Sequence, residues 1–314
     1  MVYVNTTVSY GKFYLFKIGT HKCYIILICK IRAGKLTVKA LTILRGLMAF
    51  LTSIPVRMDE SFLDISSRYM FLFPVIGAII GIIVGTYACL ANSVLFLLFG
   101  TLQNFVFSST NNVFFDFLAK GIGSAMTIAF LFVVIGLQHT DGLVDVGNAL
   151  GIKNASLKEK VDIAHEWTVT RTGALLAILV SFLTFLSIFL INTTIVIQAF
   201  IIAEVSAKLA MVTTGWQGES PPSRFYENRW EKGRSFIDSI KKKNSLYAIS
   251  LFISLIISIT LLGFSGLLAV VSSIAVGGFM IFVGKQVFEG VNGDIFGATN
   301  EIARMVALFV LVAV

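Results

Sequence analysis

GALLAILVSFLTFLSIFLINTTIVIQAFIIAEVSAKLAMVTT, residues 173–214, contains two apolar runs in direct succession. An α-helix rises 1.5 Å per residue, so about 20 apolar residues cross the hydrocarbon core of a bilayer. The runs 173–192 and 194–214 each have this length. The stretch therefore predicts two consecutive transmembrane helices.

The same composition extends through most of the chain. Of its 314 residues, 56% are hydrophobic and 13% are charged, whereas about 25% of a soluble domain is charged. We predict an all-α, polytopic bundle of about seven spans, at residues 70–91, 121–138, 173–192, 194–214, 246–263, 265–284 and 301–314. Residues 92–100 either extend the first span or form an interfacial helix. Residues 41–55, which Arg45 interrupts, are predicted as an amphipathic interfacial helix.

Glycines recur at every fourth position of the first predicted span, at Gly77, Gly81 and Gly85. Small residues at this spacing let two helix backbones approach closely. We therefore interpret them as packing residues and expect a closely apposed helix along this face.

The first 40 residues have a different composition from the rest. Residues 1–35 contain six Lys and Arg and neither Asp nor Glu. A basic segment of this kind suits a membrane surface, and an over-long start of the reading frame explains it equally well. We define 1–40 as a basic N-terminal extension and 41–314 as a single transmembrane catalytic domain. The sequence leaves open whether the chain forms a homo-oligomer.

Lys and Arg are unevenly distributed among the predicted loops. If the first span exits the membrane, residues 1–69, 139–172, 215–245 and 285–300 share one side, and they hold 22 of the 25 basic residues. The positive-inside rule identifies this side as cytoplasmic. The sequence thus predicts a multi-pass protein of the cytoplasmic membrane. The lipid bilayer is the partner that best explains the net charge of +8. Binding to nucleic acid would also explain a basic chain, but it would not require apolar membrane spans.

The sharpest polar cluster follows the second span, in GLQHTDGLVDVGN at 136–148. If the helix of 121–138 continues, Asp141, Asp145 and Asn148 lie at i, i+4 and i+7 on one face. Two carboxylates on one face repel each other unless a cation lies between them. Mg²⁺ commonly binds one or two carboxylates together with substrate phosphates. A solvated helix end with two exposed acids is the alternative.

Two more acidic groups are predicted on the same side. One contains Asp162, His165 and Glu166 and precedes Arg171. The other is NGDIFGATNE at 292–301, where Asp294 and Glu301 are seven residues apart. Its glycines would let backbone amides approach a phosphate closely, although a plain glycine-rich loop is the alternative.

Basic residues accompany these acids. Glu204 and Lys208 stand at i and i+4 within the fourth span, where an ionisable pair is either functional or structural. The loop 215–245 combines seven Lys and Arg with aromatic rings, which suits a nucleotide diphosphate and its base or anionic lipid headgroups. We interpret Lys241–Lys243 as lipid-facing.

Acids and bases thus meet in one layer at the membrane surface. In phosphoryl transfer, metal ions bridge and neutralise phosphate oxygens, and positioning supplies most of the acceleration. Carboxylates without a metal would repel a diphosphate, so the acids imply the cation. The pattern predicts a magnesium-dependent phosphotransferase.

Four stretches resemble the cobalamin synthase family, also called adenosylcobinamide-GDP ribazoletransferases. They are LRGLMAFLTSIPV at 44–56, FPVIG at 73–77, HTDGLVD at 139–145, and NGDIFGA at 292–298 with Glu301. The last two are similar to the family patterns H-x-D-G-L-x-D and T-G-D-x-x-G-A-x-x-E. The likeness covers roughly residues 41–314. The chain departs from the family at four positions, where Asn148 and Glu166 replace Asp, Asn292 replaces Thr, and Lys208 replaces Arg.

The resemblance implies the last assembly step of the cobalamin nucleotide loop. Adenosylcobinamide-GDP would react with α-ribazole or its 5′-phosphate, and GMP would leave. Catalytic candidates are His139, Asp141, Asp145, Asp294 and Glu301, with His139 as base or supporting residue. Metal candidates are Asp141, Asp145, Asn148, Glu166 and Asp294, and substrate-binding candidates are Arg68, Arg171, Lys208, Asn292 and Gly293.

Two other functions fit a chain of this composition. A phosphotransferase that uses CDP-alcohols also has an acidic site at the membrane border, but its signature places Ala-Arg two residues after Asp-Gly. In this chain Leu143-Val144-Asp145 follows Asp141-Gly142. A transporter would place ionisable residues near the middle of the bilayer and show an internal repeat.

Overall fold

The computed structural model describes residues 39–56, 61–106, 112–152, 156–164, 168–222 and 231–314. The chain divides into two units, Met1–Thr42 and Ile43–Val314. The second unit contains the bundle and every predicted site residue. Nearly all of the predicted basic extension lies outside the described residues.

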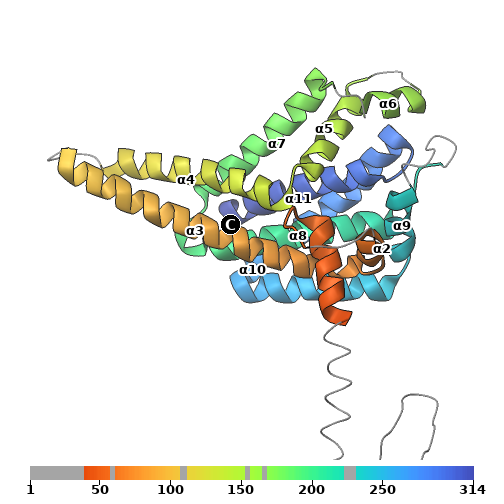
Figure 1. Cartoon of the computed structure of the whole chain (residues 1–314), viewed down its shortest axis with the longest axis horizontal. Coiled ribbons are helices and arrows are strands. Elements are labelled where there is room, and N and C mark those ends of the chain that lie inside the picture. The colour runs from red at the N-terminus through yellow and green to blue at the C-terminus, as the bar shows by residue number, and fades with distance from the viewer. Residues whose placement is uncertain (1–38, 57–60, 107–111, 153–155, 165–167, 223–230) are drawn as a thin grey trace, which may run out of the picture. The chain divides into compact units, whose positions relative to one another are not determined.

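All elements of the described residues are helices, which confirms the predicted all-α class (Figure 1). A helix covers residues 39–51. It is followed by α2 (Ser61–Arg68), η1 (Met70–Leu72), α3 (Phe73–Val106), α4 (Asn112–Ile135), α5 (Gln138–Leu150), α6 (Leu157–Ala164), α7 (Arg171–Leu190), η2 (Thr193–Ile195), α8 (Val196–Gln217), α9 (Glu231–Ile240), α10 (Asn244–Phe288) and α11 (Gly293–Ala313).

Six of the described helices are long and apolar enough to cross a membrane, namely α3, α4, α7, α8, α10 and α11. The chain is therefore a multi-pass membrane protein. Helix 39–51 is not among the six, and its Leu47 and Leu51 are buried in the core.

The 45 residues of α10 form a helical hairpin. The backbone leaves the helical region at Leu262 and Gly263, where Gly263 has a φ of +54°. Further along, Gly266 packs against the carbonyl oxygen of Ser258. These two residues would lie about 12 Å apart along a straight helix, so the chain reverses between them.

Contacts with α8 show the same reversal. Thr213 Oγ1 donates to Tyr247 Oη at 3.4 Å, and the neighbouring Thr214 Oγ1 donates to the carbonyl oxygen of Gly277 at 3.2 Å. Both arms of α10 therefore lie against one end of α8. The two spans predicted at 246–263 and 265–284 are these arms, which reconciles seven predicted spans with six helices.

Several predicted boundaries were wrong. The first span ends later than residue 91, because α3 continues to Val106 and pairs with α4 (Figure 1). Residues 92–100 thus extend the first span, which was one of their two predicted alternatives. The helix expected at 121 begins at Asn112, and the helix expected at 301 begins at Gly293. Polar residues lower the local hydropathy at both starts without preventing a helix.

Helix α8 is the centre of the bundle and packs against α3, α10 and α11. A methyl group at Gly77 would come within 2.5 Å of the backbone of Glu204, and Gly81 and Gly85 face Ile201 and Ile197 in the same way. The three glycines are packing residues, as predicted. This close contact holds the polar residues of α8 deep inside the bundle.

Candidate functional site

The H-T-D-G-L-V-D motif lies on a short separate helix. The predicted continuation of 121–138 is wrong, because α4 ends at Ile135 and Gly136 has a φ of +73°. This left-handed conformation favours glycine and ends a helix. A new helix, α5, begins at Gln138. Asp141, Asp145 and Asn148 still share this helix, so their predicted spacing on one face stands.

Two glycines bring this motif against the N-G-D motif of α11. A methyl group at Gly142 would lie 2.9 Å from the carbonyl oxygen of Asp294, and one at Gly297 would lie 3.0 Å from the carbonyl oxygen of His139. Side chains larger than hydrogen would separate the helices. The crossing places Asp141 and Asp294 on segments whose backbones touch.

Asn292 caps α11. Its Oδ1 accepts the N–H of Ile295 at 3.0 Å, and its Nδ2 donates to Asp294 Oδ2 at 2.9 Å. A Thr side chain can perform the same capping, which explains how Asn replaces the Thr of the family pattern at this position. Asn292 is buried and Gly293 is exposed.

Asp141 and Asp145 differ in exposure. Asp141 lies in the first turn of α5 and is exposed, whereas Asp145 is half-buried and already has an interaction partner. Neighbouring protein removes part of the hydration of Asp141, and this desolvation raises the pKa of its carboxyl group. A cation beside Asp141 would stabilise the charged form.

His139 lies beneath this surface. It is 6% exposed, and its Nδ1 has no hydrogen-bond partner among the described residues. Burial, followed by the positive charges of Lys208 and Arg304, lowers the pKa of His139 to about 3. The imidazole is therefore neutral at physiological pH and a weak base. This favours the second of its two predicted roles, that of a supporting residue.

Glu301 belongs to a buried ionic network between α8 and α11. Arg304 Nη1 donates to Glu301 Oε2 at 2.7 Å, and Arg304 Nε donates to Glu204. Lys208 Nζ donates to Glu204 Oε2 at 2.8 Å and to Asn300 Oδ1 at 2.9 Å. Asn300 Nδ2 completes the network with a 3.2 Å bond to Glu301 Oε1.

The network accounts for the ionisable pair Glu204 and Lys208, whose role the sequence left open. Both side chains are fully buried, and their charges are balanced by Glu301 and Arg304. A structural role fits this geometry, and Lys208 is not placed to meet a phosphate from solution. Sequence analysis missed Arg304 and Asn300 as partners. The sequence did contain one indication of this pairing. Arg304 stands three residues after Glu301 within an apolar span, where an ionisable side chain usually has a charged partner.

Asn148 anchors the start of α7. Its Oδ1 accepts from Thr170 N at 2.9 Å and from Thr170 Oγ1 at 2.8 Å, and it packs on Gly173. Both lone pairs of this oxygen are therefore occupied. The role of Asn148 as a metal ligand stays a prediction. Its hydrogen bonds to Thr170 favour a structural role instead.

The remaining predicted residues are dispersed. Arg68 ends α2 and Arg171 begins α7, and both are exposed. Glu166 lies outside the described residues. Within the described part of the chain, no group of three or more His, Cys, Asp and Glu side chains is arranged to hold a metal ion.

The donor chemistry nevertheless fits Mg²⁺. This ion retains several waters and takes only one or two protein carboxylates alongside substrate phosphates. Asp141 and Asp145 supply hard oxygen atoms on one helical face, and the contact of Gly142 with Asp294 brings a third carboxylate to the neighbouring segment.

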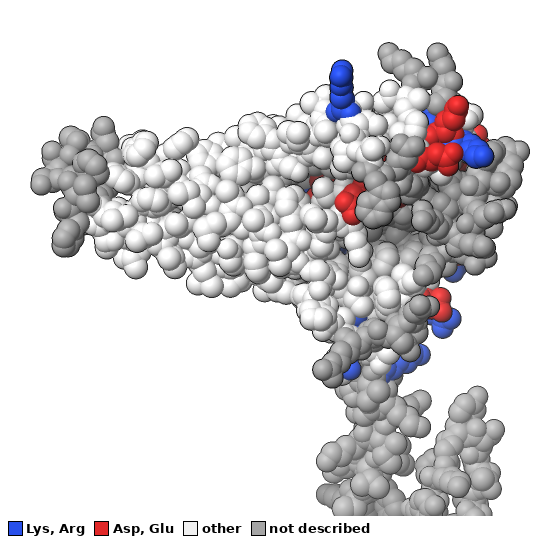
Figure 2. Space-filling model, turned by 45° about the horizontal axis from the view of Figure 1, so that its top comes forward, with Lys and Arg blue, Asp and Glu red and all other residues white. Residues whose placement is uncertain are grey.

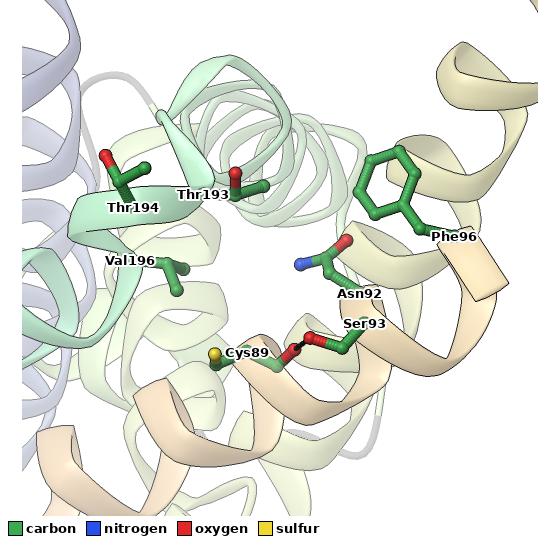
Figure 3. Close-up of a pocket in the computed structure, with 7 residues that line it drawn as sticks. All are labelled: Cys89, Asn92, Ser93, Phe96, Thr193, Thr194 and Val196. Carbon is green, nitrogen blue, oxygen red and sulfur yellow. Dashed lines mark hydrogen bonds between the residues drawn. The ribbon is translucent and has the colours of Figure 1, made fainter. Parts of the chain in front are cut away.

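The charges of the described surface lie mainly toward one end of the molecule, whereas the projecting α3–α4 pair is uncharged in this view (Figure 2). A polar pocket of about 210 Å³ lies away from these charges, where η2 meets the middle of α3 (Figure 3). It offers hydroxyl, amide and thiol groups but no carboxylate or cation, which makes it unsuitable for phosphoryl transfer. Its lining residues are Cys89, Asn92, Ser93, Phe96, Thr193, Thr194 and Val196.

Comparison with known families decides the assignment. The model of the cobalamin-5-phosphate synthase family matches residues 43–107 and 92–312. The chain belongs to this family. The membership confirms the predicted resemblance, and the matched region includes both motifs that meet at Gly142 and Gly297.

Several relatives in the family are similar over nearly their whole length. An adenosylcobinamide-GDP ribazoletransferase of Methanococcoides burtonii is 27% identical over 85% of this chain and 90% of its own. Proteins of the same name from Methanocella arvoryzae and Thermoanaerobacter pseudethanolicus are 29% and 24% identical, each over 95% of its own length. No solved structure matches the chain.

Proposed function

We propose that this chain is an adenosylcobinamide-GDP ribazoletransferase that joins adenosylcobinamide-GDP to α-ribazole or its 5′-phosphate and releases GMP. The observation that carries this proposal is the backbone contact between Gly142 and Asp294, which brings two acidic family motifs to one crossing. Family membership favours this activity over CDP-alcohol transfer and over transport.

The reaction exchanges the phosphoanhydride bond of the donor diphosphate for a phosphate ester bond to the acceptor. The acceptor ribose hydroxyl attacks the cobinamide-linked phosphorus, a new P–O bond forms, and the bond to GMP breaks with its electron pair on GMP. The hydroxyl proton passes to a base. Asp294, whose position is fixed by the cap at Asn292, is our candidate for orienting this hydroxyl.

Asp141 and Asp145 are our candidates to hold Mg²⁺. The bound ion supplies positive charge that neutralises the diphosphate and its developing negative charge. His139, which is buried in the first turn of α5, is our candidate for a supporting residue. Glu301 acts indirectly through the network that fixes α11. Arg68 and Arg171 remain candidates for phosphate contacts because both are exposed. The positive-inside distribution supports a cytoplasmic location for the site.

The test is GMP release by purified, reconstituted protein supplied with adenosylcobinamide-GDP and α-ribazole. We expect release to require Mg²⁺ and to fall at least about 100-fold in Asp141→Asn. Full activity of this variant with unchanged Mg²⁺ dependence would refute the metal assignment. Release of CMP from CDP-alcohols, without GMP release, would refute the proposed activity.

A further inference from the structure

A second polar pocket lies at the site's end of the bundle, where α8 ends and α10 begins. Its volume is about 250 Å³, and it is lined by Trp216, Gln217, Glu219, Lys241, Lys242 and Asn244. The N–H of Val291 donates to the carbonyl oxygen of Glu219 at 2.7 Å, so the pocket wall adjoins the segment that precedes Asp294. The proposed reaction uses none of the pocket residues.

The pocket carries a net positive charge from two lysines and one glutamate. Lys241 Nζ lies 3.4 Å from Glu219 Oε1, and the two side chains are 32% and 62% exposed. Such an exposed pair contributes little in water and is easily exchanged for another anion. Among the described residues, Lys242 has no acidic partner.

Trp216, which lines the pocket, is held in place by two neighbours. The rings of Trp216 and Tyr247 stack with centroids 4.0 Å apart and an interplanar angle of 6°. Trp216 Nε1 donates to Asn244 Oδ1 at 3.1 Å. Trp and Lys side chains are enriched where a span meets the lipid headgroups, because each has an apolar body and a polar end.

The pocket lies at the border of two spans. Gln217 is the last residue of α8 and Asn244 is the first of α10. Beyond Asn244, the first arm of α10 bears exposed apolar side chains at i, i+3, i+7 and i+10, which form one stripe along the helix. They are Ile249, Phe252, Ile256 and Ile259. The pocket and the stripe thus follow one another along α10, in the order in which a phosphate headgroup and its acyl chains follow one another in a lipid.

We propose that this pocket binds the phosphate of an anionic phospholipid, with the acyl chains along the apolar stripe of α10. A soluble phosphate compound would use the lysines but not the stripe. Each Lys near an anionic lipid surface strengthens binding by about fivefold. Loss of both Lys241 and Lys242 should therefore weaken lipid retention by about 25-fold.

The experiment uses the full chain in nanodiscs of phosphatidylcholine containing phosphatidylglycerol. Native mass spectrometry after release from the discs counts the phosphatidylglycerol molecules that remain bound. We expect K241Q/K242Q to lose them, and Glu219→Gln to retain more because it removes the competing acid. Lys285→Gln is the matched control, since Lys285 is an exposed lysine in the last turn of α10, outside the pocket.

Equal phosphatidylglycerol retention by K241Q/K242Q and the unmodified protein would overturn the proposal. Displacement of the retained lipid by GMP from both the unmodified protein and Lys285→Gln would also overturn it, because a soluble phosphate compound would then be the ligand of the pocket. Thermal unfolding of each variant checks that it is folded. If K241Q/K242Q does not fold, Glu219→Gln still decides, because unchanged or lower retention contradicts the expected increase.

Discussion

The backbone of Asp294 lies directly against Gly142. A methyl group at Gly142 would come within 2.9 Å of the carbonyl oxygen of Asp294 and 3.0 Å of its Cα. The obstacle is backbone, which cannot rotate away as a flexible side chain can. The distance between the two acidic motifs therefore depends on the missing side chain of Gly142.

Replacing Gly142 by Ala should separate α5 from α11 and lower activity. Misplacement of reacting groups by about 1 Å can reduce a rate about 100-fold, and we expect a loss of this order in GMP release. Gly278→Ala is the matched control, because Gly278 lies within α10 and a methyl group there meets nothing within 4 Å. Equal activity of the two variants would show that the crossing does not position the site.

Replacing Asp141 by Asn should abolish activity without lowering the stability of the fold at pH 7. Its pKa is raised in the folded protein by desolvation, so the folded state holds this proton more tightly than the unfolded state. Stability contributed by the protonated form is present at low pH and is lost as pH rises through the raised pKa. Asp141→Asn should therefore unfold at the same or a higher temperature at pH 7 than the unmodified protein, while GMP release is lost.

The matched control for this prediction is Asp162→Asn. Asp162 is an exposed acid on α6. Its replacement should change neither GMP release nor the unfolding temperature appreciably. If Asp141→Asn unfolds at a clearly lower temperature at pH 7 but not at pH 4, Asp141 stabilises the fold as an anion, and the expected direction of the stability change is wrong.

Glu204→Gln should strongly destabilise the protein. Glu204 receives hydrogen bonds from both Lys208 and Arg304 in the interior. Removing one member of a buried ionic network leaves uncompensated charge and costs about 3–5 kcal/mol. Glu219→Gln, which removes the exposed partner of Lys241, should cost less than about 1 kcal/mol. Thermal unfolding in detergent compares the two, and similar losses would contradict a structural role for the network.

Most of the fold could be predicted because the bilayer demands long apolar helices. Hydropathy located the spans, and the glycines at 77, 81 and 85 indicated a close neighbouring helix. The starts of α4 and α11 could not be found in this way. Asp294, Glu301 and Arg304 lower the hydropathy of α11, and only the tertiary partners on α5 and α8 show why a helix tolerates them there.

The candidate site was predicted in part. Helical spacing placed Asp141 and Asp145 on one face, and spacing also paired Glu204 with Lys208. Neither the helix break at Gly136 nor the crossing at Gly142 follows from a one-dimensional pattern, because both depend on backbone conformation and on a distant segment. Sequence therefore supplied the residue types, whereas the partners of Asn148, Glu301 and Arg304 required the structure.

Asn292 offers a test of how the cap positions Asp294. Its Oδ1 caps α11 through Ile295 N, and its Nδ2 holds Asp294 Oδ2. Asn292→Thr keeps the cap and restores the family residue. It removes the amide N–H that donates to Asp294 Oδ2. Asn292→Ala loses both interactions and should cost about 1 kcal/mol of stability from the cap alone.

The two variants separate capping from positioning. Asn292→Thr should unfold near the temperature of the unmodified protein, and any loss in GMP release then reports the Asn292–Asp294 bond. Asn292→Ala should lower both the unfolding temperature and GMP release, because α11 begins less firmly and Asp294 is no longer held. If Asn292→Ala matches the unmodified protein in both measurements, the cap does not position Asp294, and orientation of the acceptor hydroxyl must come from another residue.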